Sequence, residues 1–297
     1  GAMPTIVTLV DGSLYSRSVC DNAAWIASRT AAAVELMHVL GRRHPTGPTN
    51  LSGSISLGAR SALLEELATH DEQAAKLAQR RGRAILEDAQ THLAEGGITA
   101  TSRLRLGDLL EEVAEREADA DMIVIGKRGE AADFAKLHLG SNLERVARTW
   151  SKPLFVAARA FRPVKRFLVA FDGGASSLKA LDYVARSPLF AELECCILMA
   201  GADSVKNHEA LNKAGAALKS AGVAAETSLV SGQVDTVIAA AVDAQGIDLL
   251  VMGAYGHSRI RNLIIGSTTS EMLRSCKVPV VLFRETTGQS STAKATR

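Results

Sequence analysis

Long apolar runs are absent from this sequence of 297 residues. No stretch reaches the roughly 18 consecutive apolar residues that a transmembrane helix needs, and no signal-peptide pattern is present. We therefore expect a cytoplasmic protein without a membrane partner. Blocks of lysine and arginine are absent as well, because the formal net charge is only +2 and basic residues are scattered among acidic ones. This distribution gives no reason to expect a nucleic-acid partner.

Cysteine is scarce and carries no metal-binding or redox spacing. The four cysteines, none of them in a CxxC pair, are Cys20, Cys195, Cys196 and Cys276. We interpret them as small buried hydrophobic residues rather than metal or redox sites. A P-loop, GxxxxGK[ST], is missing too, and the glycine spacing does not match GxGxxG.

The composition that is present, 47% hydrophobic and 22% charged, is that of a soluble globular protein. The length is large for a single core, so we expect two domains.

One stretch near the C-terminus combines the features of a phosphate site. Residues 247–252 form an apolar run that suits a parallel strand covered on both faces. Gly253 and Gly256 follow, and glycines at this point let the backbone approach a ligand closely. After nine residues, Gly266, Ser267 and Thr268 open a predicted helix, whose free N–H groups and hydroxyls favour an anion.

The same order of features occurs twice, which indicates an internal duplication. Matched residues lie 161 positions apart at Asp11 and Asp172, and 125 apart at Gly107 and Gly232. The later pairs lie 127 apart (Gly126, Gly253) and 126 apart (Gly140, Gly266; Pro153, Pro279). The first copy therefore holds about 35 extra residues between its second and third strands, including a Gly-, Pro- and Ser-rich loop over 42–60.

Each copy predicts alternating strands and helices. The expected strands are 5–10, 34–40, 99–106, 122–125 and 154–158, then 167–171, 193–199, 226–230, 247–252 and 278–283. The expected helices are 16–28, 62–94 with Gly82 as a candidate break, 109–118 and one ending at Trp150, then 177–185, 207–221, 236–244 and one opening at Gly266. This alternation favours parallel sheets with helices on both faces and ligands beyond the carboxyl ends of the strands. Asp172, Ala200 and Gly253 lie at such ends.

Two first strands that end in aspartate, followed by Gly-x2-Gly-x9-Gly-Ser-Thr between the fourth and fifth strands, resemble the universal stress protein family. The resemblance implies two tandem Rossmann-like, HUP-type, doubly wound domains, each with a five-stranded parallel sheet. It places the first domain at 3–160, the second at 163–286 and a flexible tail at 287–297. It also implies that the two fifth strands pair, so that the copies form an internal pseudo-dimer; whether the chain also forms a homodimer stays open.

The resemblance further implies ATP binding with a divalent cation, expected to be Mg²⁺. The residues carried over to this site are Asp172, Ala200, Met252, Gly253, Gly256, Gly266, Ser267 and Thr268. His257 and Arg259 follow the glycine loop and are candidates for neutralising phosphate, although solvated charge explains them as well. Asp172 has two readings, an adenosine contact or a helix cap.

The first copy departs from the family pattern. Ten residues instead of nine separate Gly129 from Gly140, and Asn142 stands where the second copy has Thr268. We therefore expect ATP in the second copy and leave open whether the first binds a ligand. His38, at the end of a first-copy strand, is given a structural role.

Three functions compete. The first is a stress-response protein in which ATP occupancy changes the surface offered to a protein partner. The second is a slow ATP hydrolase or phosphotransfer enzyme, for which the sequence shows no arrangement of base and nucleophile. The third is a nucleotide-free interaction scaffold that uses the first-copy insertion. Binding without efficient turnover is the prediction.

Overall fold

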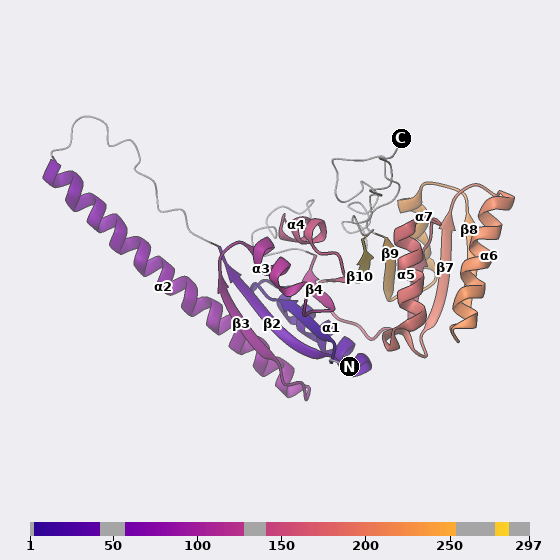
Figure 1. Ribbon diagram of the computed structural model, residues 1–297, viewed down its shortest axis with the longest axis horizontal. Helices are drawn as coiled ribbons and strands as arrows, with labels where there is room; N and C mark the ends of the chain where they lie inside the picture. Colours follow the sequence, from indigo (N-terminus) through magenta and orange to yellow (C-terminus); the bar gives the residue numbers. More distant parts are fainter. Residues whose placement is uncertain (1–2, 42–56, 128–140, 254–276, 285–297) are drawn as a thin grey trace, which may run out of the picture.

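The computed structural model describes residues 3–41, 57–127, 141–253 and 277–284, and within these ranges ten strands form one sheet (Figure 1). The first five strands are β1 Thr5–Leu9, β2 Ala33–Leu40, β3 Thr101–Leu106, β4 Met122–Gly126 and β5 Leu154–Ala157. The others are β6 Arg166–Ala170, β7 Glu194–Ala200, β8 Ala225–Val230, β9 Leu249–Gly253 and β10 Val280–Phe283. The helices are α1 Ser16–Thr30, α2 Leu57–Glu95, α3 Leu109–Arg116, α4 Ser141–Thr149, α5 Ala175–Arg186, η2 Pro188–Phe190, α6 Val205–Ser220 and α7 Val234–Ala244.

The strand order is β3-β2-β1-β4-β5-β10-β9-β6-β7-β8. Within each half all neighbouring strands are parallel, and β6 to β10 repeat the order of β1 to β5. The halves meet where β10 pairs antiparallel with β5, with Val281 opposite Phe155. The predicted fold class is confirmed, and the copies form the expected internal pseudo-dimer.

Helices cover both faces of the sheet and build two cores. One core packs α1, the C-terminal part of α2, α5 and α6 on one face, and the other packs α3, α4 and α7 on the opposite face. Adjacent strand residues point to opposite faces, so Cys195 lies in the first core and Cys196 in the second. Both are buried, as the sequence predicted. Burial raises the pKa of the Cys195 thiol to about 12, with a smaller contribution from neighbouring Cys196.

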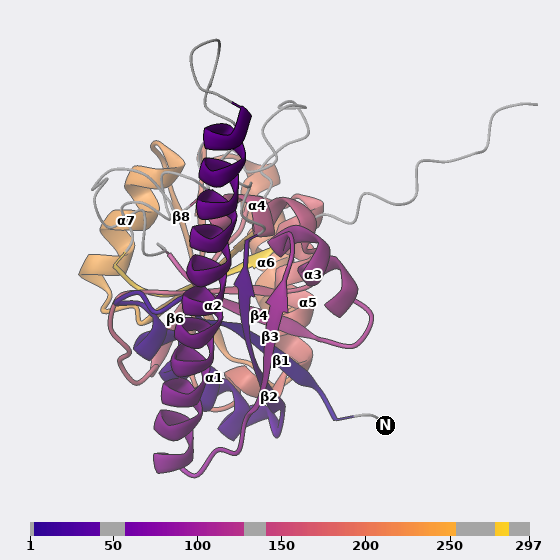
Figure 2. The ribbon, with the colours of Figure 1, turned by 90° about the vertical axis from the view of Figure 1, so that its left-hand side faces the viewer.

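Helix α2 corrects one prediction. Gly82 does not break it, because α2 runs without interruption from Leu57 to Glu95. A Cβ on Gly82 would lie 2.8 Å from Leu104 Cδ1 and 3.0 Å from His38 Cδ2. The glycine therefore lets the helix cross β2 and β3 closely (Figure 2). The predicted loop also ends earlier than expected, since 57–60 are helical.

Side chains reinforce the contact between the halves. Arg29 Nε of α1 donates to the carbonyl of Leu189 in η2 at 2.6 Å. Lys179 Nζ of α5 donates to the carbonyls of Ser151 at 3.2 Å and Arg284 at 3.0 Å. Burial lowers the pKa of Lys179, and the nearby Arg284 charge lowers it further.

The short helix η2 was not predicted. Within the described ranges, no helix combines the length and hydropathy that crossing a bilayer requires.

Candidate functional site

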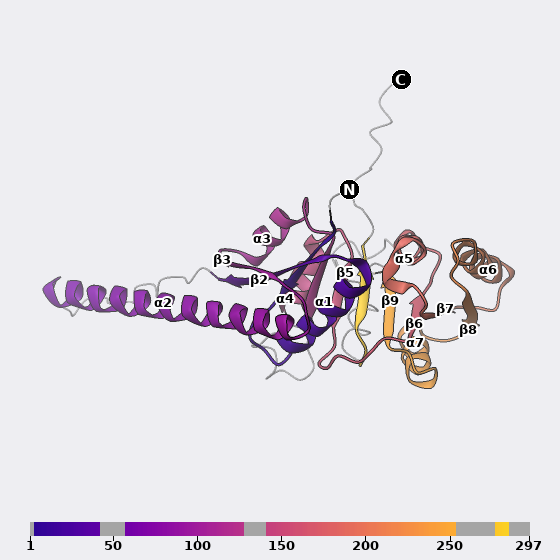
Figure 3. The ribbon, with the colours of Figure 1, turned by 90° about the horizontal axis from the view of Figure 1, so that it is seen from below.

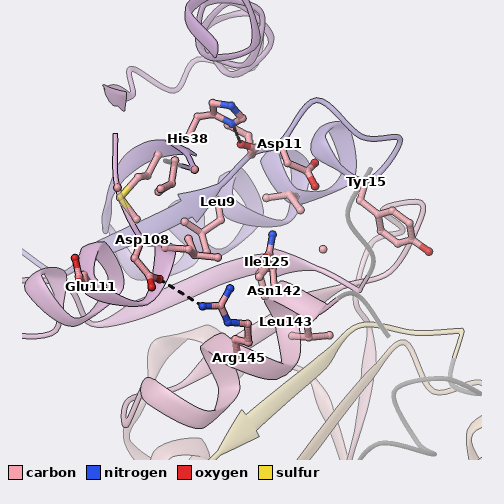
Figure 4. Close-up of a pocket in the computed structure, with 18 residues that line it drawn as sticks. Leu9, Asp11, Tyr15, His38, Asp108, Glu111, Ile125, Asn142, Leu143 and Arg145 are labelled. Atoms are coloured by element: carbon pink, nitrogen blue, oxygen red, sulfur yellow. Dashed lines mark hydrogen bonds and ion pairs between the residues drawn. The ribbon is translucent and has the colours of Figure 1, made fainter. Parts of the chain in front are cut away.

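A cavity of about 600 Å³ opens at the carboxyl edge of the first half (Figure 4). It lies where the strand order reverses, with β1 between β2 and β4, which is the usual ligand position in doubly wound sheets. Its size is that of a small-molecule site. The polar side chains in its wall are Asp11, Tyr15, His38, Asp108, Glu111, Asn142 and Arg145.

Asp11 holds the turn between β1 and α1. Its Oδ1 accepts from the Ser13 N–H at 2.9 Å and from Ser16 Oγ at 3.3 Å. Asp172 does the same between β6 and α5, accepting from the Gly174 N–H at 2.7 Å and from Ser177 Oγ at 2.8 Å. Both aspartates therefore stabilise the turn before the helix. The N-cap residues are Tyr15 of α1 and Gly174 of α5, so the helix-cap reading of Asp172 is wrong. The adenosine contact of Asp172 stays a prediction.

His38 lies in the cavity wall and is 7% exposed. Its Nδ1 lies 2.6 Å from the carbonyl oxygen of Val10. A carbonyl only accepts, so Nδ1 carries the hydrogen. This bond ties the end of β2 to the end of β1 and agrees with the structural role predicted for His38.

Acidic groups dominate the rim of the cavity. Asp108 caps α3 by accepting from the Leu110 N–H at 2.8 Å, and its Oδ1 lies 3.6 Å from Arg145 Nη2 of α4. Among the described lining residues, Asp11 and Glu111 add two further carboxylates, against the guanidinium of Arg145. This balance is unfavourable for a polyphosphate chain.

The corresponding edge of the second half brings four predicted residues together. Asp172 follows β6, Ala200 ends β7, and Met252 and Gly253 end β9. β7 and β9 flank β6, since Ala170 of β6 pairs with both Leu198 and Met252. The Met252 side chain is only 5% exposed and belongs to the core against α7. Its backbone and that of Gly253 form the end of the strand.

Gly253 lies against the first turn of α5. A Cβ on Gly253 would lie 2.1 Å from Ser176 Oγ and 2.8 Å from Ser176 Cβ. Only a glycine fits this contact, so β9 reaches the edge beside the turn that Asp172 organises. The remaining predicted residues, Gly256, His257, Arg259, Gly266, Ser267 and Thr268, lie outside the described residues.

The second half carries neutral residues where the first has its rim acids. Gln233 is the N-cap residue of α7, as Asp108 is of α3, and Thr236 matches Glu111 as the third residue of the helix. The preceding glycines share an unusual backbone conformation, with φ of 156° at Gly107 and 140° at Gly232. Asp108 and Glu111 were not among the residues predicted from the sequence. The available signal was that Asp108 directly follows the matched glycine Gly107 and that Glu111 lies in the first turn of the next helix.

Lys127, at the end of β4, is buried, and its backbone N–H donates to the Ala157 carbonyl at 3.1 Å.

Among the described residues there is no group of three or more His, Cys, Asp or Glu side chains placed to hold a metal ion.

Comparisons with known proteins agree with the duplicated fold. The model of the "Universal stress protein family" matches residues 3–158 and 198–284. The universal stress protein Slr1230 of Synechocystis is 37% identical over 288 residues, covering 95% of this chain and 100% of that protein. The chain belongs to the universal stress protein family.

Solved structures show the same tandem fold. A universal stress protein from Archaeoglobus fulgidus has a TM-score of 0.68 at 21% identity, covering 94% of this chain and 98% of its own. A protein of unknown function from Pseudomonas aeruginosa has a TM-score of 0.61 at 15% identity, covering 95% and 93%. At sequence identities of 21% and 15%, the similarity shows a shared fold.

Proposed function

We propose that this universal stress protein binds ATP with a divalent cation, Mg²⁺, at the carboxyl edge of its second half. Occupancy by the nucleotide regulates the surface that the protein offers to a protein partner in the cytoplasm. The protein binds ATP and does not hydrolyse it efficiently.

The difference between the two edges carries this proposal. In the first half, the carboxyl edge of the sheet forms the cavity of about 600 Å³. In the second half Gln233 and Thr236 replace the rim acids Asp108 and Glu111. A polyphosphate is therefore repelled less at the second edge than at the first.

The residues at the second edge fit a nucleotide. Gly253 and Ala200 offer backbone at the ends of the two strands that flank β6, and Asp172, which follows β6, has an exposed carboxylate. In the sequence, Gly253 begins the spacing Gly-x2-Gly-x9-Gly-Ser-Thr. Its helix-opening residues are suited to phosphate, and the cation would take hydroxyl, phosphate and water oxygens.

Isothermal titration of the full chain with ATP and Mg²⁺ tests the proposal. We expect one ATP per chain, weakened at least tenfold by the double change Ser267→Ala and Thr268→Ala. The matched control is Ser141→Ala with Asn142→Ala in the first half, which leaves the affinity unchanged. Absence of binding, or a loss only in the control, contradicts the proposal. Single-turnover hydrolysis well above the rate of the Ser267/Thr268 variant would make the protein an ATPase.

A further inference from the structure

Helix α2 has two parts with different surroundings. In its C-terminal part, Gly82, Leu86, Ala89 and Leu93 are buried against the sheet and α1. Between 58 and 81 every residue is exposed or half-buried. Figures 1 and 3 show this N-terminal part, called the extension below, running out beyond the sheet. Among the described elements, the extension has no core of its own.

The extension carries an apolar stripe. Leu63, His70, Leu77 and Ala84 recur every seven residues, with Leu67 and Ala74 beside them, which is the repeat of a helix that packs on another helix. Leu77 is 64% exposed. A helix of this length draws most of its stability from burying such a stripe, so the extension is built to pack against a further element.

An acidic segment of α2, 65–72, is followed by a basic segment, 76–83. The acidic residues of the N-terminal segment 65–72 are Glu65, Glu66, Asp71 and Glu72. The basic residues of the C-terminal segment 76–83 are Lys76, Arg80, Arg81 and Arg83. Two such helices in parallel would place like charges together. Arranged antiparallel, they place each acidic segment beside a basic one.

We infer that the extension is a dimerisation surface whose partner is the extension of a second copy of this chain, packed antiparallel about a two-fold axis. With the axis beside Glu72 and Gln73, Leu67 lies across from Leu77 of the second copy. Glu66, which flanks the stripe, then lies across from Arg80 of the second copy. The pairing is self-complementary, as a two-fold interface requires. Ala74, a small residue of the stripe, lies near the crossing.

Within the described ranges, the outer side of α2 is exposed to a second helix. Arg80 and Ala84 are exposed and lie on the side of α2 away from the sheet, whereas Gly82 and Leu86 contact it. The stripe turns gradually toward that outer side, because a repeat of seven falls short of two full turns of a 3.6-residue helix. The second copy therefore packs over the outer side of α2 and leaves the contacts with β2, β3 and α1 in place.

Sedimentation velocity of the full chain without nucleotide tests the inference, independently of ATP binding. We expect a monomer–dimer equilibrium with a dissociation constant on the order of micromolar, typical of a modest interface. Leu77→Glu should weaken the dimer at least tenfold. Leu14→Glu is the matched control, because Leu14 is 63% exposed and lies outside α2.

Charge reversal tests the antiparallel arrangement. One variant changes Glu65, Glu66 and Glu72 to Lys, and the other changes Lys76, Arg80 and Arg83 to Glu. We expect each variant alone to be monomeric and an equimolar mixture to form a heterodimer, with circular dichroism confirming that both fold. A monomeric wild type at 100-fold the expected dissociation constant overturns the inference. So does a dimer that survives Leu77→Glu or either charge reversal.

Discussion

The two halves share strand order and helix placement but differ at their carboxyl edges. Among the described residues, three carboxylates and one guanidinium line the cavity of the first edge, whereas the second edge has Gln233 and Thr236 in place of two of the acids. Strand ends and glycine turns shape the carboxyl edge, and the first residues of α3 or α7 determine its charge. The fold alone therefore does not assign a ligand.

A second contrast separates α2 from α6. Helix α6 spans 16 residues and buries Leu211, Ala214 and Leu218 along its length. Helix α2 spans 39 residues, and its buried residues lie from Gly82 onward. The C-terminal part of α2 thus performs the covering role of α6, and the extension is additional.

We expect the largest effects from truncating leucine side chains, which compares the stability contributions of the C-terminal part of α2, of α6 and of the extension. We expect Leu86→Ala in α2 and Leu218→Ala in α6 each to lower the free energy of unfolding by about 3 kcal/mol, because each removes a buried side chain. Leu67→Ala in the extension should cost less than about 0.5 kcal/mol in dilute, monomeric protein. Urea unfolding measures all three, and equal losses at Leu67 and Leu86 would remove the contrast.

The contact of Gly253 with α5 comes next in size. Gly253→Ala should cost about 2 kcal/mol, because the new methyl group overlaps Ser176 Oγ. Adding Ser176→Gly should recover part of this loss. Gly41→Ala, where a Cβ meets nothing within 4 Å, is the control and should change stability by less than about 0.5 kcal/mol. A Gly253→Ala variant as stable as the control would show that β9 does not press on the turn.

Exchanging the rim acids tests the electrostatic contrast directly. Gln233→Asp with Thr236→Glu gives the second edge the acids of the first. We expect ATP affinity to fall about tenfold, or about 1.4 kcal/mol, at low salt, and less at high salt. The reverse exchange, Asp108→Gln with Glu111→Thr, should leave that affinity unchanged. Calorimetric titration of both variants decides whether rim charge matters.

The buried thiols should show no difference between the halves. Burial raises the pKa of Cys20 in α1 and of Cys195 in β7 to about 12 in each case. Both should resist iodoacetamide at pH 8 in the native protein, read by mass spectrometry. Because unfolding lowers these pKa values toward 9.0, their contribution to stability is complete below about pH 9 and declines as the pH rises toward 12. Rapid labelling of one cysteine alone would show that its half opens more readily.

Local sequence patterns predicted the fold well but not the wall of the cavity. Apolar runs and repeated glycines located all ten strands to within a few residues, because strand burial and strand ends are local properties. Gly82 was misread as a helix break, since the reason for a glycine there is the approach of His38 and Leu104 from other strands. Asp108, Glu111 and Arg145 were not selected, because only the packing of α3 beside α4 brings them to one rim.

By itself the sequence determined the duplication, the parallel halves and the family, because these depend on spacing and periodicity along the chain. The tertiary structure decided the register in which β5 and β10 pair, the position of the first cavity, and the extension of part of α2 beyond its own core. Each depends on which distant residues meet. That is set by the packing of helices on a shared sheet and not by any local run of residues.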